Sequence, residues 1–525
     1  MSDNTTNITL LVTSDVHGNI FPTTYRDHEP APHGLARTAS LIKEIRGEKE
    51  NVLLLDNGDM IQGTPLTYHH AKYRSDEDNP MIRCMNELRY DAAVIGNHEF
   101  NYGLAYLQSA IQLADFPYLC GNILDGTKKE PVFGKPYEIK QVDDVKVAIV
   151  GVTTHFIPNW EDPNHIEGLV FEHVLESTRR WVKEVREKEQ PDVMIVAYHG
   201  GFERDLETGE PTESLTGENV GYEICHSIEG IDILVTGHQH RSLAEKVNGV
   251  TIVQPGSTGA FLGEVSIAVE HIHNGKKTVT SNSKLHQVTN DILPDQTILN
   301  LVSSYERETQ IWLDQPIGQI EGDMMIHDAF ETRIQDNPFI EFINKVQMDA
   351  ADVAISSTAL FHNASPGFPQ DITMRDIVSN YIYPNTLKVI EISGADMKQA
   401  LELSASYFAL DEDGELKVSR SFLEPKPQHY NYDMWEGIEY VLDISREIGD
   451  RVGKLAIKGI PVAADHMYQV VMNNYRAAGG GDYVMFKGKE VLREITTDMT
   501  ELIADYISKR NIIEATCNQN WQVIK

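Results

Sequence analysis

Cysteine, long apolar runs and positive charge are all scarce in this sequence of 525 residues. The four cysteines are widely spaced and form no C-x-x-C pair, which indicates free thiols rather than a disulfide framework. No apolar run approaches the roughly 18 residues that a membrane helix requires. The polar first residues lack the basic, apolar and cleavage regions of a signal peptide. We therefore expect a cytoplasmic protein with no membrane partner.

The shortage of positive charge is large: 45 Lys and Arg stand against 79 Asp and Glu, for a formal net charge of −34. Such a field repels polynucleotides, so we expect no polynucleotide partner. Small anions are not excluded, because divalent cations in a cleft invert the local charge. A hydrophobic content of 41% is ordinary for a globular protein, and the length predicts at least two domains.

Apolar strand-like runs alternate with helical stretches as far as about residue 290. The predicted strands are Ile8–Val12, Val52–Leu55, Ala92–Ile95, Val145–Val150, Val193–Ala197, Ile231–Val235 and Thr251–Val253. This alternation predicts an α/β architecture, and the almost continuously apolar strands predict sheets buried on both faces. We expect a first domain over residues 1–293, a linker helix within 294–323 and a smaller α+β domain over 324–525.

Five short motifs rich in Asp, Asn and His each follow a predicted strand of the first domain. They read T-S-D-V-H-G, D-N-G-D, G-N-H-E, Y-H-G-G and G-H-Q-H, and begin at residues 13, 56, 96, 198 and 237. Loops at the carboxyl ends of neighbouring strands share one edge of a sheet, so their side chains can converge. The seven candidate ligands are Asp15, His17, Asp59, Asn97, His199, His238 and His240. This mixture of nitrogen and oxygen donors suits manganese, iron, cobalt or zinc.

The seven residues divide naturally between two divalent cations. Asp15 and His17, two apart in an extended segment, are expected to point to the same side. We assign Asp15, His17, Asp59 and His240 to one ion, and Asp59, Asn97, His199 and His238 to the other. Asp59 would bridge them, because a carboxylate has two oxygens. Two ions about 3.5–4 Å apart can clamp the attacking and leaving oxygens of a phosphoryl transfer.

Taken together, the five motifs resemble those of the calcineurin-like metallophosphoesterases. With its second domain, the chain resembles the two-domain nucleotidases of that superfamily over nearly its whole length. The resemblance implies a sandwich of two sheets flanked by helices, with the metals at its edge. It also implies that residues 1–293 form the catalytic domain and that the smaller α+β domain, residues 324–525, binds the nucleotide.

His98 directly follows the ligand Asn97, so it is expected beside the metals without binding them. There it can stabilise the transition state and protonate the leaving oxygen. Members that act as 5′-nucleotidases usually carry G-N-H-E-F-D, whose Asp pairs with the His. This sequence has Asn101 instead, which can orient the imidazole but cannot neutralise it. The form G-N-H-E-F-N-Y-G-L is similar to the 2′,3′-cyclic-nucleotide 2′-phosphodiesterase/3′-nucleotidase group.

The second domain adds to that similarity. It contains D-N-P-F, Y-P-N-T, Y-N-Y-D-M and N-N-Y-R-A with a following G-G-G, which match the cyclic phosphodiesterase pattern. The Asn-Gly-Gly-Gly-Ile-Arg run of 5′-nucleotidases is replaced at residues 357–363 by a stretch without Arg. Tyr432 and Tyr483 are predicted as the two aromatic walls of a base site. Asn431, Asn474 and Asp482 are predicted to hydrogen-bond the base or ribose.

These features favour a dimetal hydrolase that opens 2′,3′-cyclic nucleotides to 3′-nucleotides and removes the 3′-phosphate. Its partner would be a small nucleotide, whose base is left open, as is the oligomeric state. One alternative is a 5′-nucleotidase or a hydrolase of nucleotide sugars such as UDP-sugars. A second, from another class, is a nucleotide-binding sensor that has lost turnover. The intact ligand set and His98 argue against the sensor.

Overall fold

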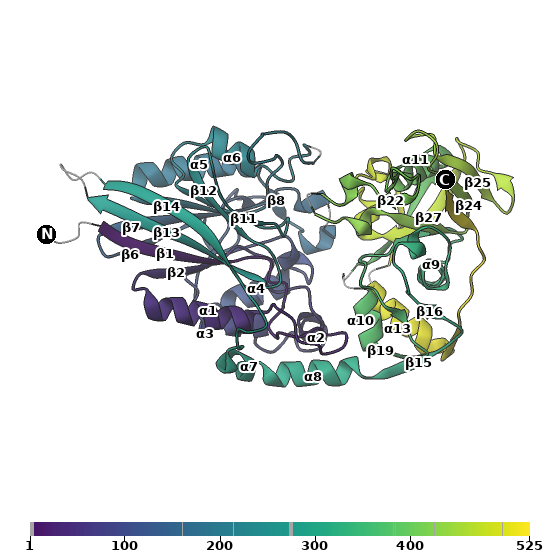
Figure 1. Ribbon diagram of the computed structural model, residues 1–525, viewed down its shortest axis with the longest axis horizontal. Coiled ribbons are helices and arrows are strands. Elements are labelled where there is room, and N and C mark those ends of the chain that lie inside the picture. The colour runs from purple at the N-terminus through teal and green to yellow at the C-terminus, as the bar shows by residue number, and fades with distance from the viewer. Residues whose placement is uncertain are drawn as a thin grey trace. The chain divides into compact units, whose positions relative to one another are not determined.

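The chain folds into two compact units, Met1–Thr309 and Gln310–Lys525, as described by a computed structural model. The structure describes residues 5–159, 161–213, 215–271, 277–381, 383, 385–424, 426–495 and 497–525. The N-terminal unit contains the five motifs. Figure 1 shows the elements of both units.

Two six-stranded sheets form the centre of the N-terminal unit. In spatial order, the first sheet consists of β14 (Lys277–Gln287), β13 (Phe261–His271), β1 (Thr5–Thr13), β2 (Val52–Asp56), β3 (Ala92–Val94) and β4 (Tyr118–Leu119). The second consists of β11 (Ser242–Val247), β12 (Val250–Pro255), β10 (Ile233–Val235), β9 (Val193–His199), β7 (Val145–Thr153) and β6 (Tyr137–Val142). The predicted two-sheet sandwich is therefore confirmed.

Alternation along the strands explains why both faces of each sheet are apolar. In β9, Val193, Ile195 and Ala197 belong to the core between the two sheets. The intervening Met194 and Val196 belong to a second core on the outer face. Because successive side chains of a strand point to opposite faces, a continuously apolar strand is buried on both sides.

Helices cover the two outer faces of the sandwich, α1 and α3 below it and α5 and α6 above it in Figure 1. The helices that precede residue 290 are α1 (Leu35–Glu48), α2 (Pro65–Tyr73), α3 (Pro80–Glu87), α4 (Leu104–Leu113), α5 (Val174–Lys188) and α6 (Gly221–Ser227). Apolar residues of α1 and α3 pack on the first sheet, and those of α5 and α6 pack on the second. The layers are thus helix, sheet, sheet and helix.

Parallel pairing brings the motifs to one edge of each sheet. β1, β2, β3 and β4 run parallel to one another, as do β7, β9, β10 and β12. The paired strands β1 and β2 end together, with Thr13 opposite Asp56. The long antiparallel hairpin of β13 and β14, which we did not predict, completes the first sheet. Parallel strands thus place the motif loops side by side.

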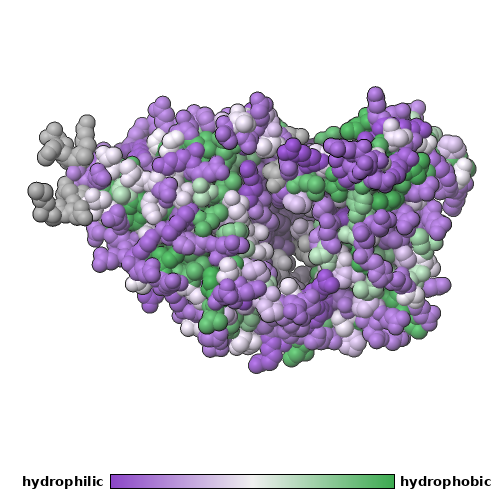
Figure 2. All heavy atoms as spheres, in the orientation of Figure 1, coloured by the Kyte–Doolittle hydropathy of each residue, from purple (hydrophilic) through white to green (hydrophobic). Residues whose placement is uncertain are grey.

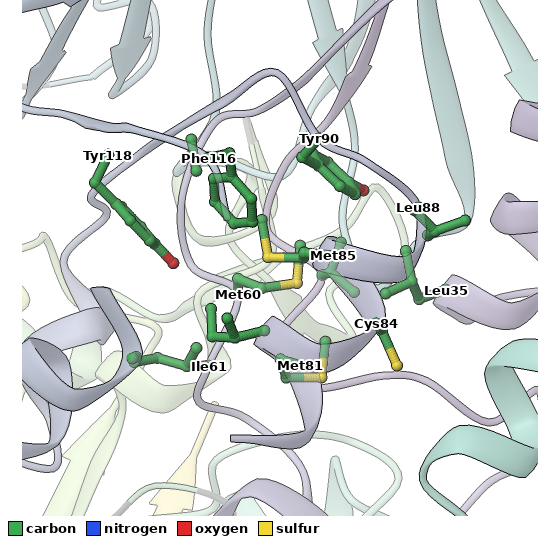
Figure 3. Packing of buried hydrophobic residues seen from close by; sticks show 14 of the residues in the cluster. Leu35, Met60, Ile61, Met81, Cys84, Met85, Leu88, Tyr90, Phe116 and Tyr118 are labelled. Carbon is green, nitrogen blue, oxygen red and sulfur yellow. The ribbon is translucent and has the colours of Figure 1, made fainter. Parts of the chain in front are cut away.

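The loop after β2 is anchored by the two apolar residues that follow Asp59. Met60 is 1% exposed and Ile61 is fully buried. Figure 3 shows both side chains among Met81 and Met85 of α3, with Leu35 of α1 in the same cluster. Burying such side chains is worth about 1.5–3 kcal/mol each. The apolar core therefore holds the backbone of this loop in place.

The segment 294–323 is not the single linker helix that we predicted. It contains α7 (Gln296–Leu301), α8 (Ser303–Leu313) and β15 (Pro316–Glu321). The helix is interrupted at Val302, whose φ of −118° is not helical and whose side chain is fully buried. β15 pairs with strands of the C-terminal unit.

The C-terminal unit is an α+β domain, as predicted. Its largest sheet consists of β23 (Asp433–Glu436), β17 (Ser356–Ala359), β27 (Met467–Asn473), β20 (Leu387–Ser393) and β28 (Val491–Ile495). A second sheet consists of β26 (Ile460–Pro461), β25 (Val452–Ile457), β24 (Glu439–Asp443) and β30 (Trp521–Ile524). Its longer helices are α9 (Pro338–Ala351), α10 (Met374–Asn380), α11 (Gly394–Ala405) and α13 (Met499–Arg510).

The surface, the thiols and the helix lengths bear on the composition of the chain. Figure 2 shows mainly hydrophilic residues on the viewed face, interrupted by small hydrophobic patches. All four cysteines are free, and three of them are buried. Within the described part of the chain, no helix combines the length and the apolar character needed to cross a bilayer.

Candidate metal centre

The seven predicted ligands converge at the carboxyl ends of the strands, in two groups. In the first group, ligand atoms of Asp15, His17 and His240 all lie within 4.8 Å of one another. The His17 and His240 Nε2 atoms are 3.1 Å apart, and His240 Nε2 is 3.5 Å from Asp15 Oδ1. Three donor atoms at this spacing can surround one cation.

The second group lies on the other side of Asp59. Ligand atoms of Asp59, His199 and His238 all lie within 4.8 Å of one another. Asn97 Oδ1 lies 3.2 Å from His199 Nε2 and 2.9 Å from His238 Nδ1. Asp59 Oδ2 is 3.2 Å from His199 Nε2 and 3.9 Å from His17 Nε2, so it reaches both groups. This is the arrangement expected of a bridging carboxylate.

The backbone at this edge adopts an uncommon conformation. Five of the seven predicted ligands, namely Asp15, His17, Asp59, His238 and His240, have φ between 50° and 66°. For non-glycine residues this left-handed region costs about 1–3 kcal/mol each and is concentrated at functional sites. The structure also corrects our view of the first motif, because Asp15 and His17 lie in the loop after β1 with left-handed backbone angles and not in an extended segment. Both side chains nevertheless reach the same group.

Two motif glycines allow the loops to approach one another. A Cβ on Gly96 would lie 2.2 Å from Asp59 Oδ1, and a Cβ on Gly237 would lie 2.7 Å from Asp15 Oδ2. Both distances are far below a normal contact, so any side chain would displace a predicted ligand. Glycine at these two positions is therefore a requirement of the site.

Three of the histidines are held by their second ring nitrogen. His199 Nδ1 lies 2.7 Å from the Asn57 carbonyl oxygen, and His17 Nδ1 lies 3.2 Å from that of Gln62. His238 Nε2 lies 2.8 Å from Glu218 Oε1. Metal-binding histidines usually donate their other N–H to such an acceptor, which fixes the tautomer and the ring orientation. In each ring the remaining nitrogen faces the predicted cation.

The charges of the centre also suit cations. Burial raises the pKa of Asp15 to about 7, and burial lowers the pKa of His17 to about 4. For His199, burial acts to lower the pKa, but the carboxylates of Asp59 and Asp15 outweigh it and raise the pKa to about 10. The buried carboxylates thus attract positive charge strongly enough to keep a proton on His199. Divalent cations would supply that charge instead, so the donor set and its charge both fit them.

Glu99 holds two of the motif loops together, a role that we did not predict. It is 1% exposed, and its carboxylate accepts hydrogen bonds from the backbone N–H groups of Gly96, Asp59 and Met60 at 2.6–2.8 Å. The available signal was the acidic residue that ends the third motif, two positions after the ligand Asn97. Glu218, which contacts His238, lies in a long loop without any motif, so the sequence offered no comparable signal.

His98 lies beside the two groups, as predicted. Its backbone N–H donates to Asp59 Oδ1 at 2.8 Å, and its ring centroid lies 5.2 Å from that of His17. Its Nδ1 is 2.7 Å from Asn101 Oδ1. The structure therefore brings the predicted catalytic pair together, next to the bridging carboxylate.

The aromatic walls that we predicted for the base are not available in the structure. Tyr432 and Tyr483 are both fully buried. The Tyr432 ring stacks on Tyr407 with centroids 4.9 Å apart, and its hydroxyl donates to the Arg333 carbonyl oxygen. The Arg476 guanidinium lies over the Tyr483 ring at 3.9 Å. Both rings are part of the domain core, because their faces are already covered by other side chains.

The three predicted polar contacts differ in exposure. Asn431 is 4% exposed, Asn474 is half-buried and Asp482 is exposed. Asn431 Nδ2 donates to Gln428 Oε1, while its Oδ1 and that of Asn474 are buried without a hydrogen-bond partner. The two amides therefore have acceptor capacity left over, and the roles of all three residues remain predictions.

Two other tyrosines of the same loops are half-buried, Tyr430 and Tyr475. The Arg476 guanidinium connects them: Nη2 donates to the Tyr430 carbonyl oxygen at 2.9 Å, and the group lies 5.6 Å from the Tyr475 ring centroid. A Cβ on Gly480 would lie 2.6 Å from ring atoms of Tyr475, so the glycine lets that ring pack closely on the backbone. The sequence motifs could not show that Tyr430 and Tyr475 are half-buried while the neighbouring tyrosines, Tyr432 and Tyr483, lie in the core.

Comparison with known proteins identifies the family. Residues 8–242 match the calcineurin-like phosphoesterase family, and residues 316–488 match the 5′-nucleotidase C-terminal domain. The crystal structure of a putative 5′-nucleotidase from Staphylococcus aureus, in complex with α-ketoglutarate, is 38% identical. The similarity covers 99% of this chain and 100% of that one, with a TM-score of 0.91.

The chain is a two-domain calcineurin-like phosphoesterase. Its family and the candidate metal groups make it a metal-dependent phosphoesterase, which confirms the expectation from the motifs. Members of this family hold divalent cations, and the seven convergent side chains are the residues that would bind them here.

Two curated relatives of this phosphoesterase are named for nucleotide substrates. The "trifunctional nucleotide phosphoesterase protein YfkN" of Bacillus subtilis is 28% identical over 98% of this chain, which spans only 39% of YfkN. The "2′,3′-cyclic-nucleotide 2′-phosphodiesterase/3′-nucleotidase" of Salmonella typhimurium is 29% identical over 99% of this chain and 89% of its own length.

Proposed function

We propose that this phosphoesterase opens 2′,3′-cyclic nucleotides to 3′-nucleotides and then removes the 3′-phosphate. The observation that carries the proposal is His98, held by Asn101 at 2.7 Å beside two groups of metal ligands. A relative named for this activity supports it over 99% of the chain. The replacement of the arginine-containing run of 5′-nucleotidases at residues 357–363 further favours a phosphate attached to the 3′ side.

The residues of the centre have distinct roles in this reaction. Bound divalent cations would supply the positive charge that activates water and stabilises the phosphoryl oxygens. Asp59 fixes the His98 backbone through its Oδ1 and reaches both ligand groups through its Oδ2. Asn101 accepts from His98 Nδ1 and so directs Nε2 away from itself. From that nitrogen, His98 hands a proton to the departing ribose oxygen.

For the nucleoside, the proposal assigns the base to the half-buried rings Tyr430 and Tyr475. Stacking on an aromatic ring is worth about 1–3 kcal/mol per base. The buried acceptor oxygens of Asn431 and Asn474 are suited to N–H or O–H groups of the base or ribose. Asp482, which is exposed, is proposed as a third polar contact.

The alternative is a 5′-nucleotidase or a nucleotide-sugar hydrolase. The specific observation in its favour is the 38% identity to a structure described as a putative 5′-nucleotidase. The silent sensor has no comparable support, since His98 contacts Asn101 and the candidate ligands gather in two groups, as turnover would require.

A substrate panel tests the proposal. Metal-depleted protein, reconstituted separately with manganese, cobalt, zinc and ferrous iron, is assayed on 2′,3′-cyclic AMP, 3′-AMP, 5′-AMP and UDP-glucose. We expect the highest kcat/KM on the cyclic substrate and 3′-AMP, and the same panel shows which metal the centre prefers. Preference for 5′-AMP or UDP-glucose would replace the proposal with its alternative. Tight nucleotide binding without turnover under any metal would favour the sensor.

A further inference from the structure

A chain of three side chains extends from His98 away from the metal centre. His98 Nδ1 is 2.7 Å from Asn101 Oδ1, and Asn101 Nδ2 donates to Glu161 Oε2 at 2.7 Å. Glu161 lies 60 residues further along the chain, in the loop that follows β7. None of the motifs contains it. The structure therefore connects a predicted catalytic histidine to a carboxylate that the sequence pattern does not single out.

Glu161 is itself firmly held. Its side chain is 7% exposed, and its Oε1 accepts from the Asp162 backbone N–H and lies 2.9 Å from His165 Nδ1. Its own backbone N–H donates to the carbonyl oxygen of Ile157, whose side chain is fully buried in the core of the first sheet. A carboxylate fixed by backbone and core contacts can orient the group that it binds.

The chemistry of the three groups sets the direction of the chain. A carboxylate can only accept hydrogen bonds, so the Asn101 amide must turn its NH₂ group toward Glu161. Its oxygen then faces His98, and an oxygen can only accept. His98 Nδ1 must therefore carry one proton, and Nε2 is the nitrogen that meets the substrate and carries the second proton, which passes to the leaving oxygen. Without Glu161, the amide could turn over and present its NH₂ group to the imidazole.

We infer that Glu161 is a positioning residue for His98 and acts through Asn101. The inference rests on the proposed function, in which His98 protonates the leaving oxygen. The chain places an amide between the imidazole and the carboxylate. Glu161 thus supplies both the orientation and the negative charge that Asn101 alone lacks.

A double-mutant cycle tests this inference. Glu161→Gln in the natural background removes the charge and lets the amide pair turn over. We expect kcat to fall about 10–100-fold, as is typical when a supporting residue of a site is lost, with little change in KM. Asn101→Asp alone should also lower kcat, because it places two carboxylates against each other. In Asn101→Asp with Glu161→Gln, the carboxylate and the amide have exchanged places, and kcat should recover above both single variants.

The decisive readout is whether Glu161→Gln lowers or raises kcat in each background of residue 101. If Glu161 had a purely structural role, its replacement would lower kcat in both backgrounds. Glu161→Gln should lower kcat when residue 101 is Asn and raise it when residue 101 is Asp. Equal losses in both backgrounds would overturn the inference, as would a Glu161→Gln variant with the kcat of the natural protein. Glu167→Gln, the same change at an exposed position of the same segment, is the matched control and should be silent.

The double-mutant cycle can still be interpreted if the proposed substrate is wrong. Every variant is assayed on 3′-AMP, 5′-AMP and nitrophenyl phosphate, with metal content and thermal unfolding measured in parallel. Preference of the natural protein for 5′-AMP would refute the substrate proposal, while the reversal of sign on 5′-AMP would still support Glu161. Loss of metal from Glu161→Gln in proportion to its loss of kcat would overturn the positioning role.

Discussion

Two regions of the molecule were predicted from motifs. One is the metal edge of the N-terminal unit, formed by the seven candidate ligands, and the other is the nucleoside region of the C-terminal unit, formed by residues 430–433 and 473–483. At the metal edge, six of the seven predicted side chains form two groups, with ligand atoms within 4.8 Å of one another in each group. The seventh, Asn97, lies 3.2 Å from His199 and 2.9 Å from His238. In the nucleoside region, the two predicted aromatic walls are fully buried in the core. The predicted metal ligands therefore lie close together, whereas the predicted aromatic walls lie inside the core.

The difference lies in what determines the position of each residue. The metal ligands follow strands whose parallel order forces their carboxyl ends together, so topology alone brings them to one place. Tyrosines near a loop have no such constraint, because either a core or a surface position satisfies an aromatic ring. Tyr432 stacks on Tyr407 in the core, whereas Tyr475 packs against Gly480 and is half-buried. Only packing distinguishes them.

The largest effect is expected at the metal edge, at the residue shared by both ligand groups. Asp59→Ala removes the oxygens that reach His17 and His199 and the acceptor of the His98 N–H. We expect turnover to fall to the background level and bound metal to be lost, as measured by steady-state assay and elemental analysis. Asp27→Ala, at an exposed acid of the same unit, is the control. Retained metal with normal turnover would remove Asp59 from the centre.

The second largest effect is expected at His98, where a substitution should lower turnover without loss of metal. His98→Ala should keep both cations, because no ligand is removed, and should lower kcat by about 10²–10⁴ as expected for a lost general acid. The loss should be smaller on nitrophenyl phosphate, whose leaving group needs less protonation. Metal content and kcat are measured together, with His327→Ala at an exposed histidine as the reference. A uniform loss on all esters would contradict proton donation to the leaving group.

The smallest effects should occur in the nucleoside region and sharpen the contrast between its tyrosines. Tyr475→Ala should weaken nucleotide binding by about 1–3 kcal/mol, seen in KM, and leave nitrophenyl phosphate hydrolysis and thermal unfolding unchanged. Tyr432→Ala should instead lower the free energy of unfolding by about 3–5 kcal/mol, because it empties a buried aromatic site. Denaturant titration and kinetics on both substrates check the pair. The reverse pattern would restore Tyr432 as a base contact.

Prediction from sequence was best for long apolar strands and weakest for irregular polar segments. β7 and β9 were placed within a few residues, since burial on both faces leaves a continuous apolar signal. β14 was missed because it alternates exposed and half-buried residues, most of them polar. β13 was missed although Val265, Ile267 and Val269 form an alternating apolar pattern, which lay outside the strand–helix alternation that we followed. The same polarity hid Glu161 and Glu218, which gain meaning only from the side chains that they contact.

From the sequence alone, strand periodicity and the order of the motifs predicted an α/β domain with two groups of metal ligands, because parallel strands leave few ways to arrange the chain. The resemblance of the motifs to a known family indicated the phosphoesterase activity. The tertiary structure alone decided the left-handed turns at the ligands, the buried Glu99 that ties two loops, the carboxylate behind Asn101 and which tyrosines lie in the core. These features depend on contacts between segments distant in the chain, and such contacts form only when the apolar cores bring those segments together.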